Sequence, residues 1–207
     1  MLHYETIHSS TLELLKVLMC QKELENLRLV GGTSLALQFG HRQSIDLDFF
    51  GKPQASQEEI IEMAQRIGDI IILNRTKSIL QMVLSDVKVD VVDYSCYDWI
   101  DAPIIEDNLT LASPKDIAAL KVNAIEGRGT KKDFVDIYEL LKHYKLSEIL
   151  DFYCKKYPNY SIFRALLSLT YFEDAESQAM PTMLFPESWE NIKEIILTSV
   201  KEYQKSR

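Results

Sequence analysis

Hydrophobic residues recur along the chain with two different spacings, and the spacing changes about half-way. In the first half, short apolar runs predict strands at 27–30, 46–50, 69–73, 78–84 and 87–94. Apolar residues at helical spacing predict helices at 11–20, from Ser34 to near Gly40, and from Ser56, where Glu59 completes a capping box. We therefore expect an α/β module with one mixed sheet, in which Ser85 and Asp86 form a hairpin turn.

After about residue 108 nearly every segment has helical periodicity. Helices are predicted at 114–127, 131–144, 146–156, 161–174 and 188–204, and residues 177–188 are expected to form a loop. Ser113, Pro114 and Asp116 are typical of a helix start. The predicted class is α/β (α+β), with an α/β core over residues 1–108 and a helical bundle over residues 109–207. Six aromatic residues are expected in the core of the bundle rather than as base-stacking platforms: Phe134, Tyr138, Tyr144, Phe152, Phe163 and Tyr171.

Composition narrows the classes of function. The 207 residues are 46% hydrophobic and carry a formal net charge of −8, which argues against a protein that coats nucleic acid through a broad basic face. Cys20, Cys96 and Cys154 lie far apart without a C-x-x-C spacing, as is typical of reduced thiols in a cytoplasmic protein. No apolar run reaches the ~18–20 residues that span a bilayer, so we expect no membrane association.

Two aspartates stand in an otherwise apolar strand. Side chains alternate along a strand, so Asp46 and Asp48 are expected on one face, about 7 Å apart at Cα, while Ile45, Leu47 and Phe49 enter the core on the other. Two unpaired carboxylates this close repel each other. A divalent metal would remove that repulsion, and oxygen ligands favour Mg²⁺ or Mn²⁺. The alternative is that both carboxylates face solvent on an edge strand, or pair with Arg42 and a lysine.

A third carboxylate would complete a two-metal site, and the segment VKVDVVDY supplies two candidates, Asp90 and Asp93. Because they are three residues apart, they face opposite sides of a strand. Asp90 has a valine on either side, as Asp48 has Leu47 and Phe49, so we choose Asp90 and leave Asp93 as the alternative.

A glycine turn precedes the aspartate strand. Gly31, Gly32, Thr33 and Ser34 lie between a predicted strand and a predicted helix. Glycines let the backbone approach a bound group, a helix start offers free N–H groups with a partial positive charge, and the two hydroxyls add donors. The turn is therefore a candidate site for the phosphates of a nucleoside triphosphate, although it matches neither the P-loop nor the G-x-G-x-x-G motif.

A phosphate turn some 12 residues before a D-x-D strand, with a third acidic strand later, resembles the nucleotidyltransferase superfamily that includes DNA polymerase beta. GGTSLALQFGHRQSIDLDFF resembles the opening motif of the AbiEii/AbiGii toxin family within it. SPKDIAALKVNAIEGRGTKKDFVDIYELL and LSLTYFEDAE resemble that family's later segments, in the expected order. The likeness runs from about residue 24 to residue 176.

The resemblance implies roles for residues in both halves. The turn at residues 31–34 would hold phosphates, and Asp46 and Asp48 would bind metal, with Asp90 carried over from the wider superfamily. Lys121 matches the family's motif lysine and would contact the phosphates. Asp133 matches its late acidic residue, which would assist catalysis or orient the acceptor; the competing role is a helix N-cap.

Residues around Lys121 also carry positive charge. Lys121 and Arg128 are seven residues apart on one predicted helix and share a face. Residues 115–132 contain five Lys or Arg and two acidic residues, locally +3 in an acidic chain. We expect Arg128 to help bind the nucleotide; the alternative is an ordinary solvated helix face.

The resemblance implies a metal-dependent enzyme that transfers NMP from an NTP to tRNA or to a protein. It further implies the toxin of a type IV toxin–antitoxin or phage-defence system, with a cognate antitoxin as partner. Two alternatives stay open: a non-catalytic module that binds nucleotides or partners on the same fold, and a small-molecule nucleotidyltransferase of the antibiotic-modifying type.

Overall fold

The computed structural model describes residues 1–206 and divides into two compact units. One consists of residues 1–40, 44–98 and 102–112, and the other of residues 41–43, 99–101 and those from Ser113 onward. We refer to them as the sheet unit and the helical unit. The sequence placed a single division after residue 108, whereas in the structure the sheet unit continues to Ala112 and two short earlier segments belong to the helical unit.

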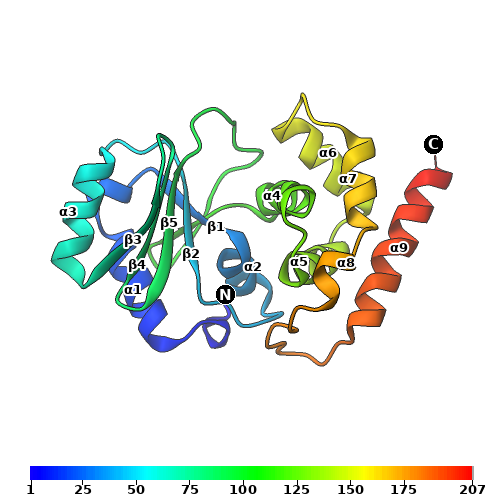
Figure 1. Cartoon of the computed structure of the whole chain (residues 1–207), viewed down its shortest axis with the longest axis horizontal. Coiled ribbons are helices and arrows are strands. Elements are labelled where there is room, and N and C mark those ends of the chain that lie inside the picture. Colours follow the sequence, from blue (N-terminus) through cyan, green and yellow to red (C-terminus); the bar gives the residue numbers. More distant parts are fainter. Residues whose placement is uncertain (207) are drawn as a thin grey trace. The chain divides into compact units, whose positions relative to one another are not determined.

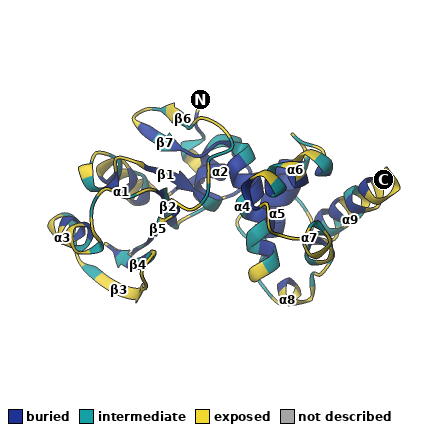
Figure 2. Ribbon diagram, turned by 90° about the horizontal axis from the view of Figure 1, so that it is seen from above, coloured by how far each residue is buried: buried dark blue, intermediate teal, exposed yellow. Residues whose placement is uncertain are grey.

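The sheet unit contains a seven-stranded mixed sheet in the order β3-β4-β5-β2-β1-β7-β6 (Figures 1 and 2). Its strands are β1 (Leu27–Val30), β2 (Leu47–Gly51), β3 (Ile70–Arg75), β4 (Ile79–Leu84), β5 (Val87–Asp93), β6 (Ile104–Glu106) and β7 (Leu109–Leu111). The five predicted strands are present. The hairpin of β6 and β7 was not predicted, because three-residue strands are too short to show an alternating pattern.

Two hairpin turns use residues with positive φ. Ser85 and Asp86 join β4 to β5 with φ of 48° and 65°, as the predicted turn requires. Asp107 and Asn108 join β6 to β7 with φ of 52° and 63°. Turns with positive φ at both central residues match the right-handed twist of the strands that they join. Asp and Asn, which occupy three of these four positions, tolerate this left-handed backbone better than most residues.

The helices of the sheet unit are α1 (Ser9–Met19), α2 (Gly31–Phe39) and α3 (Gln57–Ile67), with short 3-10 turns at Tyr4–Thr6 and Lys22–Leu24. Ser56 and Glu59 form the predicted capping box at the start of α3. α2 begins at Gly31, three residues earlier than expected, so the glycine turn is itself the first turn of the helix.

β2 lies in the middle of the sheet, antiparallel to β1 and parallel to β5. Leu47 and Phe49 are fully buried, as the alternating pattern predicts. Ile45 is 66% exposed, so its predicted place in the core is wrong. The reason is that β2 begins at Leu47, and residues before it are not held to strand alternation. The central position of β2 also excludes an edge strand as the setting of Asp48.

The helical unit contains α4 (Pro114–Gly127), α5 (Lys131–Leu141), α6 (Leu146–Lys156), α7 (Ile162–Leu169), α8 (Glu173–Glu176) and α9 (Trp189–Lys205). Ser113 caps α4 by accepting the N–H of Asp116, as predicted. The predicted helix 161–174 is divided into α7 and α8. Both the N–H and the hydroxyl of Thr170 donate to the carbonyl of Leu167, which closes the last turn of α7.

Burial in the helical unit corrects part of the aromatic prediction. Phe134 is fully buried and Tyr138 nearly so, but Phe163 and Tyr171 are 69% and 51% exposed. α7 buries Ala165 completely and leaves Phe163 on its solvent face. Within residues 1–206 no helix has the length and apolar character needed to cross a bilayer.

Candidate active site

The glycine turn and the aspartate strand meet at Gly31. Val30, the last residue of β1, is the register partner of Asp48 on β2, and α2 begins at the next residue. Gly31 has φ of +69°, in the left-handed region that favours glycine. A Cβ on Gly31 would collide with Oδ2 of Asp48. Only glycine therefore lets this carboxylate lie against the start of α2.

The two hydroxyls of the turn are used inside the sheet unit. The Thr33 hydroxyl donates to the backbone carbonyl of Asp46 and lies 2.9 Å from Oγ of Ser44. The Ser34 hydroxyl, which is fully buried, accepts a hydrogen bond of 3.1 Å from Gln38. Thr33 thus ties α2 to the segment that carries the carboxylates, and its predicted contact with phosphate stays a prediction.

The start of α2 still offers main-chain donors. Its N-cap residue is Val30, whose side chain has no polar atom that could accept an N–H of the first turn. Uncapped N–H groups and the partial positive charge of the helix start favour an anion. The phosphate role predicted for this turn therefore rests on the backbone at Gly31 and Gly32.

Two carboxylates lie on one face of the sheet next to this turn, and a third lies just before the strand. Asp48 on β2 and Asp90 on β5 are direct register partners, so their side chains leave the sheet on the same face. Asp46 directly precedes β2 and is half-buried. Asp93, in contrast, is exposed and accepts the N–H of Ser95. Of the two candidates for the third carboxylate, the structure brings Asp90 beside Asp48.

Sequence reasoning missed two side chains that hold Asp90. Nζ of Lys88 and Nε2 of Gln81 donate to Oδ2 of Asp90 over 2.9 Å and 2.7 Å. Burial lowers the pKa of Lys88, but its contact with Asp90 and the charges of Asp48 and Asp46 outweigh this effect and raise the pKa overall. Lys88 is two residues before Asp90 and hence on the same face of β5, a spacing that could have revealed it.

The donor atoms suit a divalent cation, but they are not yet arranged around one. Oδ1 of Asp90 is buried and has no hydrogen-bond partner within residues 1–206, which leaves an acceptor that a cation would satisfy. Carboxylate oxygens are the ligands that Mg²⁺ and Mn²⁺ prefer. Nevertheless, no group of three Asp, Glu, His or Cys side chains in this part of the chain forms a ready metal site. At Asp90 the positive charge comes from Lys88 instead.

The predicted residues of the second half lie in a buried ionic cluster of the helical unit. Asp136 is fully buried and receives Nε and Nη2 of Arg42 at 2.7 Å and 2.9 Å. It also binds Nε2 of His41 at 2.8 Å and Nζ of Lys121 at 2.6 Å. Arg42, named above as one possible partner of the D-x-D carboxylates, thus forms a two-pronged ion pair with Asp136.

Asp133 forms the other half of this cluster. It binds Nζ of Lys121 at 2.9 Å and Nε and Nη2 of Arg128 at 2.9 Å and 3.1 Å, and accepts the hydroxyl of Thr130. Asp133 lies in the first turn of α5, whose N-cap is Thr130, so the simple N-cap alternative is wrong. The side chain of Lys121 is 5% exposed and that of Arg128 57%. Their predicted contacts with a nucleotide stay predictions.

The pKa shifts in the cluster follow from opposite charges at close range. Burial raises the pKa of Asp136, but Arg42 and Lys121 outweigh it and hold that pKa well below its usual value. Burial likewise raises the pKa of Asp133, and Lys121 and Arg128 reverse the shift. Burial lowers the pKa of Lys121, whereas the two aspartates raise it overall.

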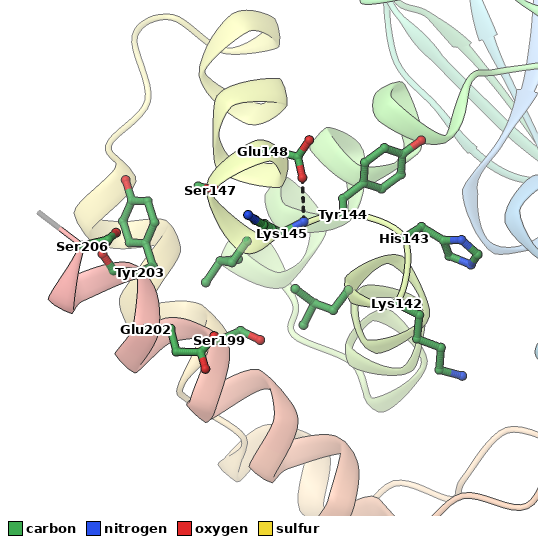
Figure 3. A pocket seen from close by; sticks show the side chains of 12 residues that line it. Lys142, His143, Tyr144, Lys145, Ser147, Glu148, Ser199, Glu202, Tyr203 and Ser206 are labelled. Atoms are coloured by element: carbon green, nitrogen blue, oxygen red, sulfur yellow. Dashed lines mark hydrogen bonds between the residues drawn. The ribbon is translucent and has the colours of Figure 1, made fainter.

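Of two hollows in the helical unit, one contains a predicted site residue, Arg128, and the other contains none. Figure 3 shows a cavity of about 700 Å³ between the α5–α6 loop and α9, lined by Tyr144, Glu148 and Tyr203 among others. It contains none of the predicted site residues. A second hollow, of about 500 Å³, is lined by Arg128, Tyr171 and their neighbours.

Comparison with known proteins identifies the family. A family model described as nucleotidyl transferase AbiEii toxin, type IV TA system, matches residues 13–201. The chain belongs to the AbiEii nucleotidyltransferase toxin family. A relative of this AbiEii protein, the uncharacterized protein aq_aa25 of Aquifex aeolicus, is 34% identical over 181 residues, which are 84% of this chain and 86% of the relative.

Solved structures confirm the fold of the AbiEii protein. MenT4, described as nucleotidyltransferase toxin Rv2826c from Mycobacterium tuberculosis H37Rv, superposes with a TM-score of 0.61 at 14% identity, over 92% of this chain and 79% of MenT4. JHP933 from Helicobacter pylori superposes with a TM-score of 0.52 at 18% identity, over 97% and 96%. The predicted family and the mixed α/β class with a helical C-terminal part are therefore confirmed.

Replacing Gly31 with alanine tests the contact between the turn and the aspartate strand. Gly31→Ala combines left-handed backbone strain with a collision at Asp48, so we expect the free energy of unfolding to fall by roughly 1–3 kcal/mol. Gly127→Ala is the control, because a Cβ there meets no atom within 4 Å. Urea unfolding measures both variants, and equal stability of the two would contradict the contact.

The ionic cluster predicts acid lability. Because the pKa values of Asp133 and Asp136 are depressed, their stabilisation is complete above the usual value of 3.8 and is lost as pH falls through the lowered values. At neutral pH, Asp136→Asn removes the carboxylate that pairs with Arg42 and one of the two that pair with Lys121, and should cost about 3–5 kcal/mol. Urea unfolding between pH 7 and pH 2 should show a flatter profile for the variant.

The matched control is Asp151→Asn, at an exposed position on α6. It should keep both the stability and the pH profile of the wild-type protein. If Asp136→Asn matched this control at neutral pH, the cluster would not stabilise the helical unit.

Proposed function

We propose that this AbiEii-family protein transfers NMP from an NTP to a macromolecular acceptor and releases pyrophosphate, with Mg²⁺ or Mn²⁺ as cofactor. The observation that carries the proposal is the placement of Asp48 against the start of α2 at Gly31, with Asp90 beside it on the next strand. The turn would bind the anionic substrate at the point where the carboxylates supply oxygen ligands.

Asp46, Asp48 and Asp90 would hold the divalent ion. When bound, the ion supplies charge neutralisation at the triphosphate and activation of the acceptor hydroxyl. The backbone N–H groups at the start of α2 orient the phosphates. The acceptor oxygen then forms a bond to the α-phosphorus, the bond from that phosphorus to the bridging oxygen breaks, and pyrophosphate leaves. The hydroxyl proton of the acceptor passes to one of these three carboxylates.

Lys88 has a supporting role in this proposal. It neutralises part of the charge of three neighbouring carboxylates before metal and nucleotide bind, since Nζ lies on Asp90 and attracts Asp46 and Asp48. A cation that binds at Asp90 competes with this ammonium group. Lys88 therefore keeps the sheet unit stable without metal, at the cost of weaker metal binding.

The helical unit supplies the remaining predicted roles. Asp133 holds both Lys121 and Arg128 by ion pairs, so we assign it the positioning of these two cations, which would contact the nucleotide phosphates. The hollow at Arg128 also contains Tyr171, which is 51% exposed. An exposed guanidinium and an aromatic ring suit the phosphates and bases of RNA.

The family description includes a type IV toxin–antitoxin system. We accordingly propose that the protein acts in the cytoplasm as the toxin of such a pair, with a role in phage defence, and that a cognate antitoxin counteracts it. Induced expression should arrest growth in a manner that depends on the transferase site.

Substitution of the carboxylates tests the reaction. Asp48→Asn and Asp90→Asn should each lower transfer of label from α-phosphate-labelled NTP to total tRNA by roughly 10²–10³-fold or more, because the divalent ion that neutralises the triphosphate would lose a carboxylate ligand. The control is Asp93→Asn, which removes an exposed carboxylate from the same strand and should stay close to wild type. Protein fractions and aminoglycosides are assayed in parallel.

Activity that survives in both Asp48→Asn and Asp90→Asn would sink the proposed site. Tight NTP binding without transfer to any acceptor would identify a non-catalytic module, and label on aminoglycosides alone would identify a small-molecule enzyme. Folding of each variant is checked by circular dichroism.

Lys88→Met tests the competition between the ammonium group and a metal ion. Without divalent ions the variant should melt at a lower temperature than wild type, because Asp90 loses its cation. Added Mn²⁺ should raise its melting temperature more than that of wild type. Lys22→Met, which alters an exposed lysine of the same unit, is the control. An equal response to Mn²⁺ in all three proteins would refute the role of Lys88.

A further inference from the structure

β3 is an edge strand of the sheet, and its apolar side chains are exposed. Ile71, Ile72 and Leu73 have 64%, 39% and 53% of their surface accessible to solvent. Figure 2 shows β3 as a largely exposed strand, whereas the neighbouring β4 buries Leu80 and Met82 completely. Natural proteins generally cover an apolar edge strand or protect it with charges, because it can pair with another chain. The interior of β3 has no such charge.

Charges flank the apolar segment with opposite sign at its two ends. Asp69 precedes β3, and Asp86 lies at the same end, because the N–H of Ser85 in the adjoining turn donates to the carbonyl of Asp69. Arg75 ends the strand and Lys77 follows it. The strand therefore has an acidic end and a basic end, separated by apolar residues.

We infer that β3 is the surface through which two copies of this chain associate, antiparallel about a two-fold axis near Ile72. A two-fold axis reverses the direction of the partner strand. The acidic end of one copy then lies against the basic end of the other. The pair between Asp69 and the partner's Arg75 therefore forms twice, once at each end of the contact. Ile71 of each copy meets the partner's Leu73. One strand supplies both halves of the charge pair, which favours a second copy over an unrelated protein.

The details of β3 indicate which forces hold this contact. The pairing of β3 with β4 shifts register between Ile72 and Asn74, so a bulge interrupts the outer edge as well. Association would therefore depend on packing of the apolar side chains and on the end charges more than on a continuous ladder of hydrogen bonds. Glu58 and Gln57 of α3 hold the guanidinium of Arg75 at the basic end. The inference does not depend on the proposed function.

Charge reversal tests the association by sedimentation equilibrium. Wild-type protein should approach twice its chain mass of 23.9 kDa over a roughly hundredfold range of concentration, as mass action requires. Asp69→Arg sets like charges against each other at both ends of the contact and should raise the dissociation constant by roughly tenfold or more. The double variant Asp69→Arg/Arg75→Asp exchanges the two signs and should restore association.

The apolar part has its own matched pair of variants. Ile71→Lys places a charge in the middle of the contact and should also raise the dissociation constant by roughly tenfold or more. Ile105→Lys alters a residue of similar exposure (69%) on β6, at the opposite edge of the sheet, and should leave association unchanged.

Three results would overturn the inference. The first is a monomer at every concentration, including one that binds a different protein through β3. The second is a dimer whose dissociation constant is unaffected by Asp69→Arg and by Ile71→Lys. The third is a dimer that Asp69→Arg weakens but that the double charge exchange does not restore, because the predicted charge pair would then be absent. Circular dichroism confirms that each variant is folded.

Discussion

The close approach of the Asp48 carboxylate to Gly31 is the constraint on which the candidate site depends. It requires a residue without a side chain, in a left-handed backbone conformation, between the end of β1 and the first turn of α2. The same register that sets Asp48 opposite Val30 sets it beside Asp90 on β5. A helix start that favours anions and carboxylates that favour cations are thereby brought together by three neighbouring elements of one unit.

Both units contain charged groups that need compensation, and they meet this need differently. In the sheet unit, Lys88 balances carboxylates that would otherwise repel one another, and Oδ1 of Asp90 keeps an unused acceptor. In the helical unit, Asp133 and Asp136 are fully buried, and each forms ion pairs with at least two cations. The first arrangement leaves capacity for a ligand, whereas the second rigidly orders its own side chains.

The sequence was sufficient for most of the long elements, because periodicity and caps are local signals. It also favoured Asp90 over Asp93 correctly as the neighbour of Asp48. It could not reveal β6 and β7, whose strands are too short to show a period, or the exposure of Ile45 just before β2. Salt bridges between distant residues, such as Arg42 with Asp136, depend on tertiary packing and leave no pattern in the sequence. The helical signal at 161–174 likewise did not show the break at Thr170.

The most direct test of the central claim is metal binding in the presence of a non-hydrolysable NTP, followed by electron paramagnetic resonance of Mn²⁺. If Asp48 and the turn at Gly31 form one site, wild-type protein binds Mn²⁺ more tightly with the nucleotide than without it. Asp48→Asn should abolish this coupling, while Asp93→Asn should retain it. Nucleotide-coupled Mn²⁺ binding of the same strength in the Asp48 variant would contradict the account.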